Sequence, residues 1–114
     1  MKLNQEEIIF CLNCCNEILR GYKLGADFET IFGTNGAKQI EDIEKKFLIS
    51  KDNEDSPELS KILSTNEGIN VVKMLVITIH ELDWELPLRT NLNKIDAGNL
   101  VSKFSNYISA TKNV

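Results

Sequence analysis

The sequence predicts an all-α protein, a single compact domain of about five to six helices, and three observations support this. The 114 residues are 42% hydrophobic and 26% charged, as in a globular chain long enough for one domain. The most apolar run, residues 69–84, has helical periodicity. Capping residues precede the other apolar stripes. We expect one domain over residues 1–114, with halves 1–49 and 57–110 joined by an exposed connector, 50–56, around the buried run.

The central run reads INVVKMLVITIHELDW, and its Val and Ile content would suit a buried strand as well as a helix. At 100° per residue, Asn70, Lys73, His80 and Glu81 fall within about a third of a turn and form a polar arc. A strand would give no clean alternation of polar and apolar residues. β-Branched residues lose only tenths of a kcal/mol each in a helix, which burial exceeds. We therefore expect a helix, buried on most sides, that ends before Pro87 and is too short to cross a bilayer.

The first half predicts two long helices and a short turn. Asn4 caps a first helix that ends near Arg20, before Gly21. Asp27 caps a turn over residues 28–32, which Gly33 ends. The expected inner face of the first helix is Ile8, Leu12, Cys15, Leu19 and Tyr22, and its wet face is Asn13, Asn16, Glu17 and Arg20. Thr34 is expected to cap the next helix, with Ile40, Ile43 and Phe47 inward and Gln39, Glu41, Asp42 and Lys46 towards water.

The second half begins after the polar connector SKDNEDS. Ser56 followed by Pro57 and Glu58 is typical of a helix start, and Gly68 is expected to end that helix. Asp96 can cap a last helix. Inward positions are Leu59, Ile62 and Leu63 in the first of these helices and Leu100, Val101, Phe104, Tyr107 and Ile108 in the last.

The two halves share an order of features that suggests two duplicated helical-hairpin halves. Each contains a three-residue step at a helix end, an Asp-aromatic-Glu turn and a Thr-Asn pair. The first copies are Asn16-Glu17-Ile18, Asp27-Phe28-Glu29 and Thr34-Asn35, and the second are His80-Glu81-Leu82, Asp83-Trp84-Glu85 and Thr90-Asn91. Duplication would favour a helix over a strand for the central run.

Charge and cysteine content narrow the function. A net charge of −4 and a pI near 5.0 disfavour a nucleic-acid binder and favour a basic partner. The amino terminus lacks a secretory signal pattern, so we expect a cytoplasmic protein. Three crowded cysteines, Cys11, Cys14 and Cys15, cannot form a disulfide framework. We expect reduced thiols that pack as small apolar residues, with a metal site or a redox switch as alternatives.

No stretch carries a specific catalytic or cofactor signature. Cys14 with His80 and Glu81 could be imagined as a nucleophile set, but the spacing does not specify it. We expect His80 on the polar arc of its helix. Residues 33–36, Gly-Thr-Asn-Gly, lack the lysine and glycine spacing of a phosphate-binding loop. We therefore expect no enzyme activity, no metal and no cofactor. Trp84 is expected in the core, with an interface anchor as the alternative.

Part of the chain resembles short, all-helical bacterial proteins of poorly described function, and some small acidic proteins of this size are immunity proteins paired with contact-dependent or other polymorphic toxins. Asn16-Glu17-Ile18, Gly21 and the segment from Asp27 to Gly33 carry the resemblance, and Trp84-Glu85 with Arg89-Thr90 looks like a second copy. It covers about forty residues. The chain departs from the group at Ile31-Phe32, where a polar and basic pair is more usual. The resemblance implies a toxin-binding role.

The sequence hypothesis is therefore an immunity protein that neutralises a cognate toxin, a nuclease, through an acidic surface. A nuclease cleft is basic because it holds phosphates, so carboxylates would compete for it and accelerate association. The candidate partner-binding residues are Asp52, Glu54, Asp55 and Glu58, followed by Asp83 and Glu85. The alternative is a regulatory protein that uses residues 21–47 as a helix-turn-helix, although the acidic character of this segment and the expected gap between its helices fit poorly.

Overall fold

Two sets of helices, each with a long, a short and a long member, make up the fold. The computed structural model describes residues 1–21, 28–53 and 57–112. The first set is α1 (Gln5–Arg20), α2 (Phe28–Phe32) and α3 (Gly36–Asn53), and α4 (Leu59–Ile62) follows. The second set is α5 (Thr65–Leu82), the 3₁₀ turn η1 (Asp83–Glu85) with α6 (Leu86–Arg89), and α7 (Lys94–Lys112). The all-α prediction is confirmed for the described part of the chain.

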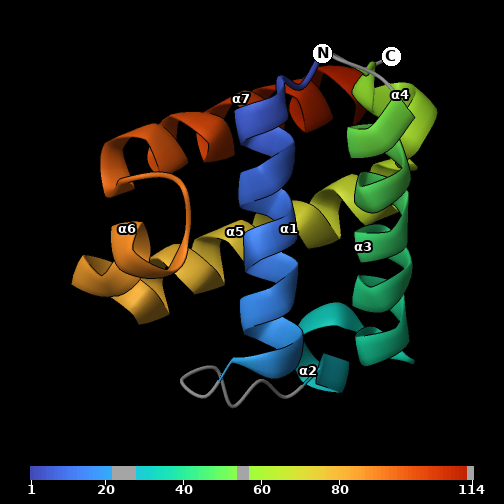
Figure 1. The fold of residues 1–114 in the computed structure, drawn as a ribbon. Helices are drawn as coiled ribbons and strands as arrows, with labels where there is room; N and C mark the ends of the chain where they lie inside the picture. The colour runs from blue at the N-terminus through green and yellow to red at the C-terminus, as the bar shows by residue number, and fades with distance from the viewer. Residues whose placement is uncertain (22–27, 54–56, 113–114) are drawn as a thin grey trace.

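The long helices pack in two pairs around a shared core. In Figure 1, α1 stands at the centre with α3 beside it, α5 passes behind α1, and α7 crosses one end of the molecule. The predicted central helix is confirmed: Val71, Met74 and Leu75 of α5 are fully buried. The predicted polar arc is wrong at Asn70, which is buried and donates a hydrogen bond to the Gln39 side chain at 2.9 Å. The radius of gyration is 13.1 Å, close to the value of about 13 Å for one folded domain of this size. No helix of the described residues has both the length and the apolarity to cross a bilayer.

The first helix begins and ends where the sequence predicts. The Asn4 side chain accepts a hydrogen bond from the Glu7 amide at 2.9 Å, and the Glu7 carboxylate accepts one from the Asn4 amide. Gly21 is the C-cap. The predicted wet face is wrong at Glu17, which is 4% exposed, and the predicted Tyr22 and Asp27 lie outside the described residues. The buried residues of α1 are Ile8, Phe10, Cys11, Cys14, Cys15, Glu17 and Ile18.

Two glycines shape the turn between α2 and α3. Gly33 ends α2 with φ +88°, a conformation that L side chains rarely adopt. A Cβ at Gly36 would lie 2.3 Å from the Phe28 carbonyl oxygen, so only glycine lets α3 start this close to α2. α3 then continues to Asn53, so the expected connector 50–56 is helical over its first residues and is shorter than predicted.

The predicted helix from residue 57 to Gly68 is wrong. α4 is a single turn, and a new helix, α5, starts at Thr65. The reason is a capping box: the Ser64 side chain accepts from the Glu67 amide, and the Glu67 carboxylate accepts from the Ser64 amide. Gly68 lies inside α5, where a Cβ would be 3.5 Å from Ile108 Cδ1. This is an ordinary van der Waals distance, so the contact between α5 and α7 at this point does not require a glycine. Ser56, the expected cap, lies outside the described residues.

In the second half, the central helix ends before Pro87 as predicted, whereas the start of the last helix differs from the prediction. α5 ends at Leu82, and Pro87 opens α6 at one of its first positions. α7 starts at Lys94, and the Asn93 side chain accepts a hydrogen bond from the Asp96 amide at 2.8 Å, so Asn93 and not Asp96 is the cap. The expected inner face of α7 is confirmed, with Leu100, Phe104 and Ile108 buried and Val101 and Tyr107 half-buried.

Candidate functional site

The structure places the predicted acidic residues in two separate regions. Asp52 is exposed in the last turn of α3, and Glu58 is half-buried, with Oε2 3.2 Å from the terminal amine of Met1. Glu54 and Asp55 lie outside the described residues. Asp83 is exposed and Glu85 half-buried, both in η1. In Figure 1, the end of α3 beside α4 and the segment around α6 lie on opposite sides of the molecule. The two groups therefore cannot act as one surface.

A groove lies between α5 and the first half of α7, next to the second acidic group. Its volume is about 510 Å³, within the usual range of ligand pockets, ~300–1,000 Å³. We call it the α5–α7 groove. It is lined by Val76, Ile79, His80, Asp83, Lys94, Gly98 and Val101.

Three large apolar side chains are exposed in the segments that carry Asp83 and Lys94. Trp84 is 69% exposed, Leu88 74% and Ile95 77%. Trp84 directly follows Asp83, Ile95 directly follows Lys94, and Leu88 lies one helical turn beyond Trp84. The expectation that Trp84 packs in the core is wrong, because η1 turns it towards solvent. We call these three residues the apolar patch. Leu88 and Ile95 were not predicted, and their only signal in the sequence is their closeness to Trp84.

The polar wall of the groove is an ion pair. Lys94 Nζ donates a hydrogen bond to Asp83 Oδ1, with 55% and 58% of the two side chains exposed. This hydrogen bond lowers the pKa of Asp83, so its carboxylate is charged at neutral pH. Asp83 also has φ +46° and ψ −114°, an uncommon conformation for a residue with a side chain. His80 is exposed, as predicted.

A partly buried ion pair holds α6, which carries Leu88 of the apolar patch, against α1. Arg89 Nε donates to Glu17 Oε1 at 2.9 Å, and only 5% of the Glu17 side chain is exposed. Asn91 adds two contacts, because its amide nitrogen donates to the Glu6 carbonyl at 2.8 Å and its amide oxygen accepts from Asn13 at 3.1 Å. Sequence reasoning placed Glu17 in water because its partner lies 72 positions away.

The cysteines behave as the apolar residues that were expected. Cys11, Cys14 and Cys15 are free and have no exposed surface. Burial raises the pKa of all three thiols, that of Cys15 to about 12, so they are protonated at neutral pH. No group of potential metal ligands is found among the described residues.

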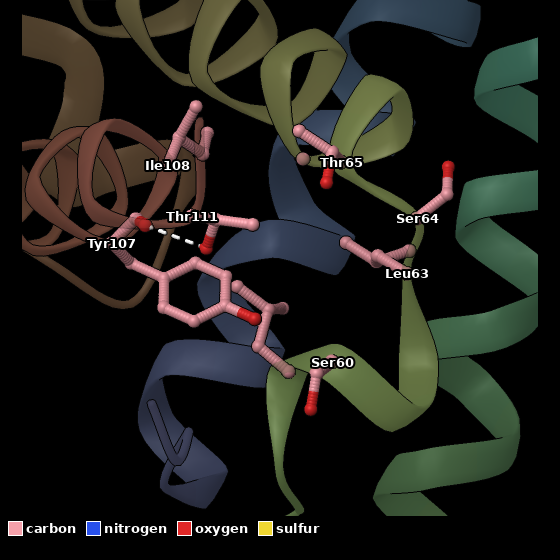
Figure 2. A pocket seen from close by; sticks show the side chains of 9 residues that line it. Ser60, Leu63, Ser64, Thr65, Tyr107, Ile108 and Thr111 are labelled. Atoms are coloured by element: carbon pink, nitrogen blue, oxygen red, sulfur yellow. Dashed lines mark hydrogen bonds between the residues drawn. The ribbon is translucent and has the colours of Figure 1, made fainter. Parts of the chain in front are cut away.

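A smaller cavity, of about 220 Å³, lies between α4, the start of α5 and the end of α7. Figure 2 shows Tyr107 from α7 and Ser60 from α4 on its walls, with the Thr111 hydroxyl donating to the Tyr107 carbonyl at 2.9 Å. Among the described residues, no charged side chain lines it, and none of Asp52, Glu58, Asp83 and Glu85 reaches it. We therefore take the α5–α7 groove with the apolar patch as the candidate site.

The short gap between α2 and α3 supports the helix-turn-helix alternative, but the charge of α3 does not. Only residues 33–35 separate α2 from α3, so the gap is shorter than expected. However, α2 has only five residues, and α3 carries as many carboxylates as lysines. The lysines are Lys38, Lys45, Lys46 and Lys51, and the carboxylates are Glu41, Asp42, Glu44 and Asp52. A helix with equal numbers of carboxylates and lysines is poorly suited to the phosphates of DNA.

Comparisons of the chain with protein-family models, curated proteins and solved structures give no match.

Proposed function

We propose that this protein is a binding protein that neutralises a bacterial toxin by covering the toxin's active site, and that it docks through the α5–α7 groove and the apolar patch. The observation that carries the proposal is the exposure of Trp84, Leu88 and Ile95 in the segments that also carry the paired residues Asp83 and Lys94. Large apolar side chains exposed together are typical of interaction sites, and Trp is enriched among residues that dominate binding energy.

The charge of the protein supports a basic partner. The chain carries a net charge of −4, and Glu81 and Glu85 lie within two residues of Asp83. A nuclease toxin has a positive cleft for its substrate, so an acidic surface attracts it and speeds association. The resemblance to immunity proteins includes Trp84-Glu85 and Arg89-Thr90, which belong to the same segment. These observations favour a toxin of the nuclease class.

The experiment takes as its candidate toxin the carboxy-terminal domain of the large secreted protein that this proposal predicts to be encoded immediately upstream. Co-expression with the present chain should restore growth of cells that the toxin domain arrests. In titration calorimetry, Trp84→Ala should weaken binding by about thirtyfold, which corresponds to ~2 kcal/mol. Ile49→Ala is the matched control, because Ile49 is 62% exposed on α3, away from the site. Complete absence of binding by the unmodified chain would refute the proposal for this toxin.

Two charge-reversal variants show which of the two acidic regions binds the toxin. Reversal of Asp83 and Glu85 should weaken binding and flatten its dependence on salt, because these carboxylates would meet the basic cleft. Reversal of Asp52, Glu54 and Asp55 tests the other region in the same assay. If only the second reversal weakens binding, the docking surface lies at the end of α3 and not at the groove.

A further inference from the structure

The turn between α2 and α3 contains the one Asn-Gly step of the chain, Asn35-Gly36. Asn35 is exposed, and its φ of +58° is a left-handed conformation that asparagine adopts more readily than most residues. Gly36 is the first residue of α3, so its N–H is one of the first four amides of a helix, which have no partner inside it. An exposed side-chain amide therefore precedes a backbone nitrogen that is not needed for the hydrogen bonds of the helix and whose residue has no side chain.

A side-chain amide and a backbone nitrogen in this order react with each other and with water, without an enzyme. Hydroxide takes the proton of the Gly36 nitrogen, which then attacks Cγ of Asn35. The new C–N bond closes a succinimide ring, and the side-chain nitrogen takes a proton from water and leaves as ammonia. Water then adds to one ring carbonyl and breaks one C–N bond. Opening at Cγ gives aspartate, and opening at the main-chain carbonyl gives isoaspartate, in which the main chain runs through Cβ and Cγ.

The close packing of Gly36 gives the two products opposite effects on the fold. A Cβ on Gly36 would lie 2.3 Å from the Phe28 carbonyl oxygen, so there is no room for one added atom. The isoaspartyl linkage adds one atom to the main chain before Gly36, which then cannot keep its place against α2. Aspartate leaves the main chain unchanged and places a negative charge at the start of α3, where the helix dipole favours it.

Gln39 holds this turn in place. Its Nε2 donates to the Thr34 carbonyl at 2.6 Å, and its Oε1 accepts from Asn70 Nδ2 of α5 at 2.9 Å. Its backbone amide donates to the Asn35 carbonyl at 3.0 Å. A bond from the Gly36 nitrogen to Asn35 Cγ is shorter than any contact between unbonded atoms, so its formation moves the peptide group that carries this carbonyl. The contacts of Gln39 therefore oppose the reaction, which proceeds when the start of α3 opens locally.

We propose that Asn35-Gly36 is a site of spontaneous deamidation with water as the co-reactant, that its isoaspartyl product loosens the packing of α3 on α2, and that Gln39 slows the reaction by holding the turn. The inference is independent of the proposed function, because the turn belongs to the first half, whereas the α5–α7 groove and the apolar patch belong to the second. The reaction limits how long a molecule keeps its folded first half.

The first test incubates the purified full chain in isotope-labelled water at mildly alkaline pH and maps its peptides by mass spectrometry. The Asn35 peptide should lose ammonia, take up one oxygen from water and appear as isoaspartate and aspartate. Asn66 is the matched internal control, because it is exposed in the first turn of α5 and Glu67 follows it in place of glycine. Asn35→Gln should stop the modification, since its longer side chain would have to close a larger ring. An unmodified Asn35 in the folded chain, in a buffer in which the urea-unfolded chain deamidates, would overturn the proposal.

The second test measures the restraint by Gln39. Gln39→Ala should speed the loss of Asn35 by about fivefold, the effect of one net hydrogen bond. Lys38→Ala is the matched control and should leave the rate unchanged, because Lys38 lies in the same turn of α3 but pairs with Asp42. Melting curves establish that both variants fold. If Gln39→Ala does not fold, Asn70→Ala frees the same side chain from α5. Equal rates in the Gln39 or Asn70 variant and in Lys38→Ala would overturn the role of Gln39.

The third test compares the products. Deamidated molecules, which gain a negative charge, are isolated by ion exchange, and their isoaspartyl content is measured by peptide mapping. A fraction rich in isoaspartate should melt about 5 °C or more below the unmodified chain. Its amides in α2 and the first turn of α3 should exchange faster with deuterium. Asn35→Asp, which has the aspartyl product alone, should melt no lower than the unmodified chain. Equal melting temperatures of the isoaspartyl fraction and Asn35→Asp would overturn the claim that isoaspartate loosens α3.

Discussion

The two halves of the molecule have the same order of helices, but the short connecting segment is buried in the first half and exposed in the second. In the first half, the short helix α2 turns its aromatic residues inward: Phe32 is 4% exposed, and its ring centre lies 6.2 Å from that of Phe28. In the second half, η1 and α6 occupy the corresponding place, and Trp84 and Leu88 are 69% and 74% exposed. The comparison indicates that the first connecting segment completes the core, whereas the second presents a surface.

Ion pairs differ between the halves in the same way. Arg20 binds both oxygens of Glu44 at 2.8 and 2.9 Å and ties α1 to α3 within the first half. Asp83 and Lys94 are paired at the groove in the second half. The buried pair of Glu17 and Arg89 joins the halves, so the position of the exposed surface depends on the core of the other half.

The largest expected effect contrasts the two connecting segments directly. Phe32→Ala should lower the free energy of unfolding by about 3–5 kcal/mol, because it leaves a cavity in the core. Trp84→Ala should change it by no more than about 0.5 kcal/mol, as at most exposed sites. Urea denaturation measures both values. A large loss for Trp84→Ala would mean that η1 contributes to the core, and the contrast between the halves would disappear.

The next effect concerns the ion pair between Glu17 and Arg89. Arg89→Ala should cost about 3–5 kcal/mol, because it leaves the Glu17 carboxylate buried without its cation. Arg20→Ala should cost much less, since 54% of the Arg20 side chain is exposed to water. Chemical denaturation of both variants provides the comparison. If Glu17→Gln with Arg89→Ala recovers none of the loss, burial of the charge is not its cause.

The smallest expected effect, counted for one thiol and one pH unit, is a loss of folding stability at alkaline pH. It arises from the cysteines of the first half. Burial raises the pKa of the Cys11, Cys14 and Cys15 thiols, that of Cys15 to about 12. In the unfolded chain these thiols titrate near pH 8.5. Their contribution to stability is therefore complete below that pH and is lost as the pH rises towards the folded value.

The expected slope is about −1.4 kcal/mol per pH unit for each thiol that ionises only on unfolding. Denaturation curves between neutral and alkaline pH measure it. Cys15→Ala should reduce the slope by the share of one thiol, and this difference separates the cysteines from lysines and tyrosines that titrate nearby. An unchanged slope in Cys15→Ala would argue against burial as the cause.

The sequence predicted what depends on near neighbours. Asn4 and Gly21 bound α1 because caps act over a few residues. The helical period of the central run was sufficient to predict a helix there, because α5 is buried on several sides. Ser64 was missed, although Ser64 and Glu67 form a complete capping box, because Gly68 was given more weight as a helix end. Capping hydrogen bonds and close packing against α7 outweigh the low helix propensity of one glycine.

The site was predicted only in part because it depends on distant contacts. The burial of Glu17 follows from Arg89, and no local pattern encodes that partner. The exposure of Trp84 follows from a 3₁₀ turn of three residues, too short for a periodic signal. Asp83 was named as a candidate, but its pairing with Lys94 and the groove beside it appear only when α7 folds back on α5.

The contacts between α7 and the amino-terminal segment that contains α1 have a consequence for biosynthesis. Lys103 binds Glu7 at 3.0 Å across 96 positions, and it also donates to the Lys2 carbonyl at 3.1 Å. A ribosome adds about 5–20 residues each second, so roughly 5–20 s separate the translation of these partners. Until Leu82 has been translated, α1 lacks a complete α5, and until the end of the interval it lacks the Lys103 contact from α7. Its three thiols are then open to oxidants and chaperones, from which the finished molecule shields them.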